Sequence, residues 1–408
     1  HKLVKPGDFI RMPWWFRALN SSWKASYPFG TRIRLDKDRL IRSARKSTGL
    51  KDLGSDFWEE PLDRMLQAIN EEAELHPIGL FISRERIVNL LANRLRAEHH
   101  FKEHPEILEQ ELYPVWLIAG LQRTGTTKLQ RLLNADPDNR VLASWEAINP
   151  APFLNENSIP KKRISKARMA EKALKLMAPG FFAIHPVEHM APEEDILLLD
   201  TTFLSTTPEA TMHVPSYAAW LEQTDQTPAY EYAAKLMKLL QWQRPAKRWI
   251  LKSPHHLEFL GLAGKVFGNV RYIWTHRDPC IAIPSFLSMM SHSWALFSNE
   301  VSLEKVAAHW MRKSTFILEK GMEFRMNNGH DPFLDIRYEN LVSNSLGELQ
   351  RIYGEIDDEL QAKFMESENN NPPQKYGKHL YSLDDFGLER KDIIDKIPRY
   401  QQFLQEYE

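Results

Sequence analysis

The pattern of hydrophobic and polar residues along this chain changes near Tyr113. Before that point, apolar residues recur at helical spacing over 61–75, which begins with proline, and over 83–99. Residues 1–110 contain neither a glycine-rich loop nor a clear strand. We therefore expect a mainly helical N-terminal extension over residues 1–110.

Short apolar runs take over after this extension. The first, Tyr113–Gly120, ends in glycine and suits a strand buried on both faces of a parallel sheet. Similar runs lie at 248–251, 270–274 and 332–336, and segments with helical periodicity lie between them at 214–243, 255–267 and 303–325. Strands that alternate with helices are typical of parallel βαβ units, so we expect an α/β fold with a parallel sheet flanked by helices. The polar segment 366–373 is the best candidate for an exposed loop.

A loop bracketed by glycines follows the first predicted strand directly. It reads Gly120-Leu121-Gln122-Arg123-Thr124-Gly125-Thr126-Thr127 and precedes a helical pattern at 129–133. Such a loop points backbone N–H groups and the positive end of a helix at one place, which suits a phosphate or a sulfate. The glycine spacing matches a nucleotide P-loop, but Thr126 stands where that motif has lysine, and the cation within the loop is Arg123. The alternative is an ordinary strand-to-helix turn with incidental glycines.

The residues Arg-Thr-Gly-Thr-Thr at 123–127 resemble the 5′-phosphosulfate loop of sulfotransferases, especially the broad bacterial group and the tyrosylprotein sulfotransferases. The resemblance implies a P-loop sulfotransferase domain over 111–408. It also implies transfer of a sulfuryl group from 3′-phosphoadenosine-5′-phosphosulfate (PAPS) to a hydroxyl or amine of a small-molecule acceptor. The donor-binding residues of the loop would then be Arg123, Thr124, Gly125, Thr126 and Thr127.

A second segment resembles the 3′-phosphate clamp of the same family. Arg277 follows the predicted strand 270–274, and Ser285 comes eight positions later. A guanidinium matches a phosphate with two parallel hydrogen bonds, and a hydroxyl on the next helix adds another donor. The alternative is that Arg277 forms a surface ion pair with Asp278. Two anion sites on neighbouring βα turns would match the two ends of one cofactor.

Three more segments carry the resemblance toward the C-terminus. Lys252 ends a predicted strand, where open α/β sheets bind ligands, and resembles the lysine of a Lys-x-Pro element that contacts the phosphosulfate. Tyr338 begins a Tyr-Glu-x-Leu segment and would lie near the cofactor. A solvated lysine and a packed tyrosine are the alternatives for these two residues. Residues 379–388 resemble a bacterial signature, beside which Lys375 or Lys378 would close over the nucleotide.

Sulfuryl transfer also needs a base for the acceptor's proton and positive charge for the moving group. Glu146 occupies the position of an acid that serves as the base in some relatives, although Trp145 before it departs from their pattern. Arg123 and Lys252 would stabilise the transferring group. Cytosolic sulfotransferases use a histidine as base, and the candidates of that kind are His185, His189, His213, His255 and His256. Residues 181–190, with 191–195 after them, resemble an insert of the bacterial group that would shape the acceptor pocket, and the alternative is that the acids at 193–195 begin a helix. These acids favour a helix over 196–200 rather than a strand of nucleoside triphosphatase type.

The composition of the chain argues against several classes of function. The 53 basic and 54 acidic residues leave no net positive field for nucleic acid or an anionic membrane. The single cysteine cannot form an intrachain disulfide, no signal peptide precedes the first element, and no run approaches the roughly 18 apolar residues of a membrane helix. We therefore expect a cytoplasmic enzyme. We expect it to bind no metal, because no clustered ligand spacing occurs.

A P-loop nucleotide kinase and a non-catalytic nucleotide-binding protein are the rival interpretations, and the missing loop lysine speaks against the first. The acceptor, the oligomeric state and the role of the tryptophans near residues 14–23 stay open.

Overall fold

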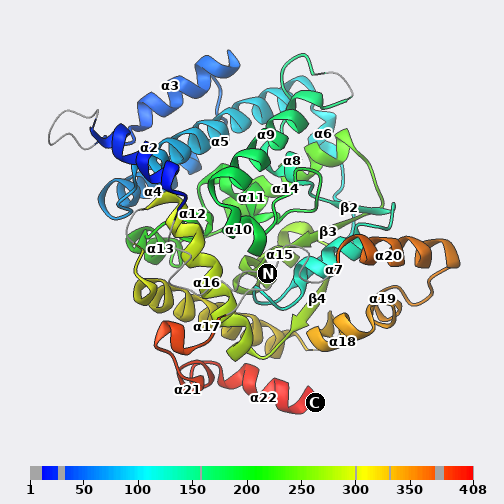
Figure 1. The fold of residues 1–408 in the computed structure, drawn as a ribbon. Helices are drawn as coiled ribbons and strands as arrows, with labels where there is room; N and C mark the ends of the chain where they lie inside the picture. Colours follow the sequence, from blue (N-terminus) through cyan, green and yellow to red (C-terminus); the bar gives the residue numbers. More distant parts are fainter. Residues whose placement is uncertain are drawn as a thin grey trace.

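The computed structural model describes residues 12–25, 33–156, 159–298, 301–329, 332–372 and 381–407. Its centre is a sheet of five parallel strands in the order β2-β3-β1-β4-β5 (Figure 1). The strands are β1 (Val115–Ala119), β2 (Asn139–Val141), β3 (Arg248–Lys252), β4 (Val270–His276) and β5 (Phe333–Arg337). The prediction of an α/β fold with a parallel sheet flanked by helices is confirmed. Only β2 lacks a strand prediction, because it contributes three residues and has no apolar run of its own.

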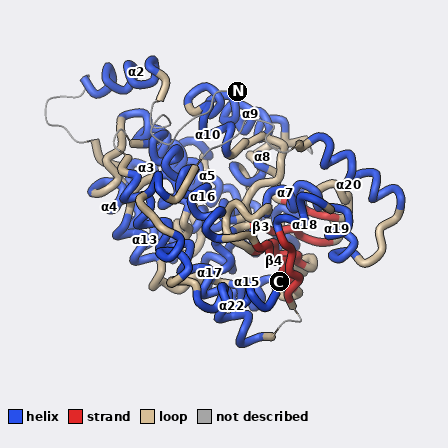
Figure 2. The backbone as a smooth tube through the Cα atoms, turned by 60° about the horizontal axis from the view of Figure 1, so that its bottom comes forward, coloured by secondary structure: helices blue, strands red, loops and turns tan. Residues whose placement is uncertain are grey.

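Successive residues of the central strands belong to different hydrophobic cores on the two faces of the sheet. Leu117 of β1 packs in the larger core, whereas its neighbour Ile118 packs in a smaller core with Leu129 and Leu133 of the loop helix. This alternation explains why the strands read as continuous apolar runs, since both faces must exclude water. Figure 2 shows the strands gathered in one part of the molecule, with α18, α19 and α20 beside them.

Helices cover both faces of this sheet. The smaller core is covered by α7 (Thr126–Leu133), α18 (Tyr338–Ser343), α19 (Ser345–Tyr353) and α20 (Asp358–Asn370). The larger core contains residues of α14 (Thr227–Gln243), α15 (Leu260–Phe267), α16 (Pro279–Phe297), α17 (Leu303–Asn328), α21 (Arg390–Ile394) and α22 (Pro398–Tyr407). Because α20 extends to Asn370, the exposed loop predicted from residue 366 onward is wrong for its first five residues.

The N-terminal residues are helical, as the pattern predicts. They form α2 (Trp14–Ala25), α3 (Lys37–Thr48), η1 (Asp56–Trp58), α4 (Glu59–Glu71), α5 (Pro77–Glu103) and α6 (Glu106–Glu109). Ile87, Leu91 and Leu95 of α5 belong to the same core as the sheet residue Leu117, so the hydrophobic core continues across residue 110. The domain boundary at 110/111 stays a prediction.

The segment between β2 and β3 contains short helices. They are α8 (Ser144–Ile148), α9 (Lys161–Met177), α10 (Pro179–Ile184), α11 (Ile196–Leu199), η2 (Asp200–Thr202), α12 (Thr207–Thr211) and α13 (Pro215–Leu221), while η3 (Pro254–Glu258) follows β3 and η4 (Asp384–Phe386) precedes α21. The helical pattern at 214–243 is divided between α13 and α14, because Pro228 starts a new helix near its first position. The helix predicted at 196–200 is present, and no strand forms there.

The helix α16 corrects the expectation that no segment is long and apolar enough for a membrane helix. Its 19 residues are long and apolar enough to cross a membrane by length and composition. Inside the fold, 94% of the most hydrophobic stretch is buried between α10, α12 and α17. Burial on nearly all sides accounts for this composition, because a helix that is apolar all round must be covered by protein or lipid.

Candidate functional site

The loop from Gly120 to Thr127 joins β1 to α7 in a strained, tightly packed conformation. Gly120 has φ +139°, and a Cβ at this position would lie 2.4 Å from Oγ1 of Thr275. Arg123 has φ +69°, a left-handed conformation that is uncommon outside glycine and is found at ligand-binding sites. Thr124 donates a hydrogen bond to the carbonyl of Leu121 at 2.6 Å, and its Oγ1 lies 2.7 Å from that of Thr275. The loop is therefore locked against the end of β4.

Four of the residues predicted for the donor site meet at this loop. Nε of Arg123 donates to Oγ of Ser285 at 3.1 Å, and Nη1 of Arg277 donates to the carbonyl of Arg123 at 2.8 Å. The guanidinium of Arg277 stacks 4.0 Å above the ring of Tyr338, which also lies against the position of Gly125. The sequence separates these residues by more than 200 positions, so the sheet topology brings them together.

Positive charge accumulates here without a matching negative charge. Burial lowers the pKa of Arg123, and the neighbouring Arg277 lowers it further. Neither guanidinium forms an ion pair with a carboxylate in the part of the chain that the structure describes. Two close cations without counter-charges, next to the N-terminus of α7, are an arrangement that favours anion binding.

The third predicted cation, Lys252, lies at the carboxyl end of β3 and is only 2% exposed. Its Nζ donates to Oε1 of Glu194 at 2.6 Å, and its backbone N–H donates to Oδ1 of Asp195 at 2.8 Å. His256 holds the other oxygen of Asp195 at 2.6 Å. Glu194 and Asp195 therefore hold the side chain and the backbone of the lysine in place.

The profile of the sulfotransferase family matches residues 114–361, which is more than half of the chain. The chain belongs to the sulfotransferase family. The sulfotransferase STF1 from Mycobacterium tuberculosis H37Rv is similar in structure, with a TM-score of 0.76 and 28% identity over 89% of this chain and 98% of that one. The sulfotransferase STF9 from Mycobacterium avium has a TM-score of 0.81 and 24% identity over 93% and 98% of the two chains, which supports the fold alone. No curated protein matches the chain.

In this sulfotransferase, the predicted base Glu146 lies in a buried ion pair. Its two oxygens accept hydrogen bonds from Arg140 at 2.8 Å each, and Arg244 and the backbone N–H of Ala143 donate to it at 3.0 Å. Burial alone would raise the pKa of Glu146, but the two arginines lower it overall. A carboxylate that is 1% exposed and bound to two guanidinium groups is a weak base, so this geometry favours a structural role.

Among the histidine candidates, His185 lies nearest to the cations. It follows Ile184, whose carbonyl lies 3.5 Å from Nη1 of Arg123, and it interacts electrostatically with Glu193, Glu194 and Lys252. Burial lowers its pKa despite the two carboxylates. His185 is therefore neutral near pH 7 and has a nitrogen that can accept a proton.

Three of the other histidine candidates have contacts that point to structural roles, whereas both ring nitrogens of His255 are buried without a hydrogen-bond partner among the described residues. Nδ1 of His189 lies 2.5 Å from Glu171, and His213 packs on the ring of Trp294. His256 lies between Asp195 and Tyr230, and His255 packs between aromatic rings. The predicted tail residues Lys375 and Lys378 lie outside the described residues.

Glu194, Asp195 and Thr275 are site residues that the sequence prediction did not assign. The acids were predicted as part of an acceptor-pocket insert or as the start of a helix, and their pairing with Lys252 and His256 depends on a contact across 57 or more residues. Thr275 directly follows the predicted strand 270–274, so its place at the edge of the sheet was the available signal. Across the described ranges, no group of three or more His, Cys, Asp or Glu side chains could hold a metal.

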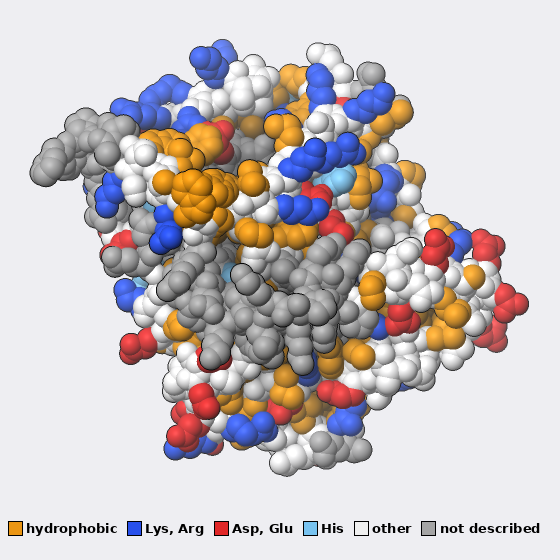
Figure 3. Space-filling model, in the orientation of Figure 1, with side chains coloured by type: hydrophobic (Ala, Val, Ile, Leu, Met, Phe, Trp, Pro, Cys, Tyr) orange, Lys and Arg blue, Asp and Glu red, His pale blue; other side chains and the backbone are white. Residues whose placement is uncertain are grey.

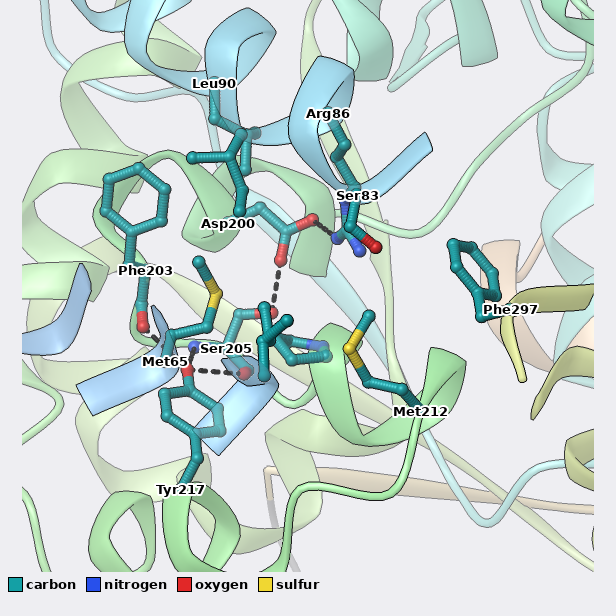
Figure 4. A pocket seen from close by; sticks show the side chains of 13 residues that line it. Met65, Ser83, Arg86, Leu90, Asp200, Phe203, Ser205, Met212, Tyr217 and Phe297 are labelled. Carbon is teal, nitrogen blue, oxygen red and sulfur yellow. Dashed lines mark hydrogen bonds and ion pairs between the residues drawn. The ribbon is translucent and has the colours of Figure 1, made fainter. Parts of the chain in front are cut away.

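A small apolar pocket between α5, α12 and α13 lies apart from these cations (Figure 4). Its volume of about 20 Å³ has room for roughly one water molecule. The charged groups on its wall are paired, because Arg86 donates to Asp200, which also accepts from Ser205. None of the donor-site residues named above lines this pocket.

Proposed function

We propose that this sulfotransferase transfers a sulfuryl group from PAPS to a hydroxyl or amine of a small-molecule acceptor. The observation that supports the proposal is the pair of unmatched guanidinium groups, Arg123 and Arg277, at a glycine-bracketed loop and helix N-terminus. Arg123 and the loop N–H groups would bind the 5′-phosphosulfate. Arg277 and Ser285 would bind the 3′-phosphate, and Tyr338 would hold the Arg277 guanidinium in position.

The donor supplies a sulfuryl group that is activated by its phosphate leaving group. The acceptor oxygen or nitrogen forms a bond to sulfur while the bond from sulfur to the phosphate oxygen breaks on the opposite side. Lys252 and Arg123 would neutralise the charge that grows on the leaving oxygen, which is the usual means by which such groups lower a barrier. Because Lys252 is almost fully buried, its charge acts in a medium of low dielectric and is effective.

We propose Glu194 as the proton acceptor in place of Glu146. Glu194 is half-buried, with 27% of its side chain exposed, and it touches Lys252 directly. When Lys252 turns to the phosphosulfate, this carboxylate loses its cation and becomes a stronger base beside the reacting group. His185 is the second candidate, because it is neutral and belongs to the same cluster.

Calorimetry tests the donor assignment. The protein should bind 3′,5′-adenosine bisphosphate, the product left by the donor, more tightly than ATP and without Mg²⁺. Equal affinity for ATP, or binding that depends on Mg²⁺, would refute the PAPS assignment and favour a nucleotide kinase. Bisphosphate binding without sulfuryl transfer to any of a broad panel of hydroxyl and amine acceptors would instead indicate a binding protein.

A further inference from the structure

A second positively charged hollow lies on the helical part of the molecule, between α3, α5 and α9. This groove has a volume of about 590 Å³. Its wall includes Thr48 at the end of α3, Asn89 and Arg96 of α5, Phe153 in the loop after α8, and Lys162 and Lys166 of α9. Figure 3 shows that Lys and Arg side chains gather over α9, whereas Asp and Glu side chains gather over α20.

Arg96 is the unusual residue of this groove. It is 4% exposed, and its Nη2 donates to the side-chain oxygens of Asn93 at 2.5 Å and Asn149 at 3.3 Å. Its Nε is buried and has no hydrogen-bond partner among the described residues, and no described carboxylate forms an ion pair with its guanidinium. Burial lowers the pKa of Arg96 to about 10, with a further contribution from Arg163. A buried guanidinium held by neutral amides retains the capacity to bind an anion.

Lys166 adds a second cation at the same place. Its Nζ and the Cζ of Arg96 each lie 4.7 Å from the centre of the Phe153 ring, so both cations contact one aromatic ring. Burial lowers the pKa of Lys166, and the charge of Arg96 lowers it further.

The acids nearby are already engaged. Glu156 accepts two hydrogen bonds from Nε of Arg163, at 2.9 and 3.1 Å. Glu85, which lines the groove, pairs with Arg84. The cations of the groove therefore exceed the carboxylates that are available to neutralise them.

We propose that this groove binds a small molecule with an oxyanion group, held by Arg96 and Lys166 against the ring of Phe153. Phosphate, sulfate and carboxylate groups share the chemistry that these side chains recognise. The chain as a whole has a net charge of −1, so the positive field of this groove is local and suits a small ligand rather than a polymer or a membrane. The proposal does not depend on the assignment of the donor site.

Pyridoxal 5′-phosphate is a suitable probe, because its phosphate would bind Arg96 while its aldehyde forms an imine with Lys166. Borohydride reduction makes the adduct permanent, and peptide mass spectrometry of the full-length protein locates it. Pyridoxal, which lacks the phosphate, corrects for the reactivity of each lysine. Lys172 is the control, because it is exposed on the same helix and does not line the groove. We expect the ratio of labelling by the two aldehydes to be about ten-fold higher at Lys166 than at Lys172, as one charge-assisted contact implies.

The Arg96→Gln variant should remove most of this preference at Lys166 and leave Lys172 unchanged. Where Arg96→Gln fails to fold, Ser165→Asp introduces a carboxylate at an exposed position on the groove wall and should have the same effect. Added inorganic phosphate, inorganic sulfate or benzoate should protect Lys166, and the most effective of the three identifies the oxyanion. An equal ratio at Lys166 and Lys172, a ratio that survives both variants, or protection by none of the three anions would overturn the proposal.

Discussion

Replacing Glu146 by glutamine tests whether this carboxylate supports the fold or removes the acceptor's proton. In the native protein its oxygens accept two hydrogen bonds from Arg140 at 2.8 Å, one from Arg244 at 3.0 Å and one from the backbone of Ala143 at 3.0 Å. Glutamine replaces one oxygen by an NH₂ group that faces a guanidinium. Arg140, which is 0% exposed, then keeps its charge without a counter-charge.

The size of the effect follows from this burial. Removing one partner of a buried ion pair costs about 3–5 kcal/mol, because the other charge remains without compensation. At roughly 2 °C per kcal/mol for a large domain, the Tm should fall by about 6–10 °C. Differential scanning calorimetry at pH 7 measures this shift, and kcat below the transition should stay within about ten-fold of the wild type.

The matched control is Glu194→Gln, which changes the same chemical group at a half-buried position. This variant also removes the counter-charge of Lys252, which is 2% exposed, so its Tm should fall as well; the two variants differ in kcat, which should fall by roughly 10²–10⁴ for Glu194→Gln alone, the usual contribution of a general base. A wild-type Tm for Glu146→Gln together with a hundred-fold loss of kcat would refute the structural interpretation and make Glu146 the base. The double variant Arg140→Met/Glu146→Leu should recover much of the lost stability, because it leaves no buried charge.

Three further outcomes are expected. Arg277→Ala should weaken 3′,5′-adenosine bisphosphate by about 1.5–3 kcal/mol in calorimetry and leave adenosine 5′-phosphosulfate nearly unaffected; equal weakening would remove Arg277 from the 3′-phosphate. Gly120→Ala should destabilise the protein in urea unfolding by at least about 1–3 kcal/mol, because the new Cβ meets Thr275 at a φ that alanine disfavours; an unchanged midpoint would contradict the strain. Burial raises the pKa of Asp335, but Arg325 and His276 lower it to about 2, so its stabilising effect is present above the ordinary value of 3.8 and is lost as pH falls toward 2. Asp335→Asn should therefore flatten the stability profile between those values, and an unchanged profile would exclude this linkage.

The sequence predicted an element well where the apolar pattern of the segment itself indicates that element. The strands β1, β3 and β4 are largely buried on both faces and the edge strand β5 is partly buried, so their apolar runs are visible without knowledge of any partner. The strand β2 is different, because its three residues are stabilised by pairing with β3 and contain no such run. The same limit applies to α20, where polar residues extend a helix that packs on α7 through Phe364.

The cations proposed for the donor site stand out in the sequence because they lie at or after the ends of strands of a parallel sheet, whose carboxyl ends meet at one edge. Arg123, Lys252 and Arg277 all come from such positions. Their roles stay predictions, and so does the role of Glu146 as the base. A carboxylate next to a loop helix has no local sign that two arginines, one of them about 100 residues away, will bury and neutralise it.

The contact between Lys252 and Glu194 joins the residue proposed to stabilise the leaving group to the residue proposed to accept the proton. Without a donor, these groups neutralise each other at 2.6 Å, which stabilises a lysine that is 2% exposed. An arriving phosphosulfate would compete with Glu194 for the same cation and would raise the basicity of the carboxylate only after the donor is bound. Glu194 would then accept the acceptor's proton only when the donor is bound and sulfuryl transfer can follow. Removing the lysine would therefore damage both the stabilisation of the leaving group and the timing of proton removal, whereas removing the carboxylate would damage proton removal and leave the buried lysine without its counter-charge.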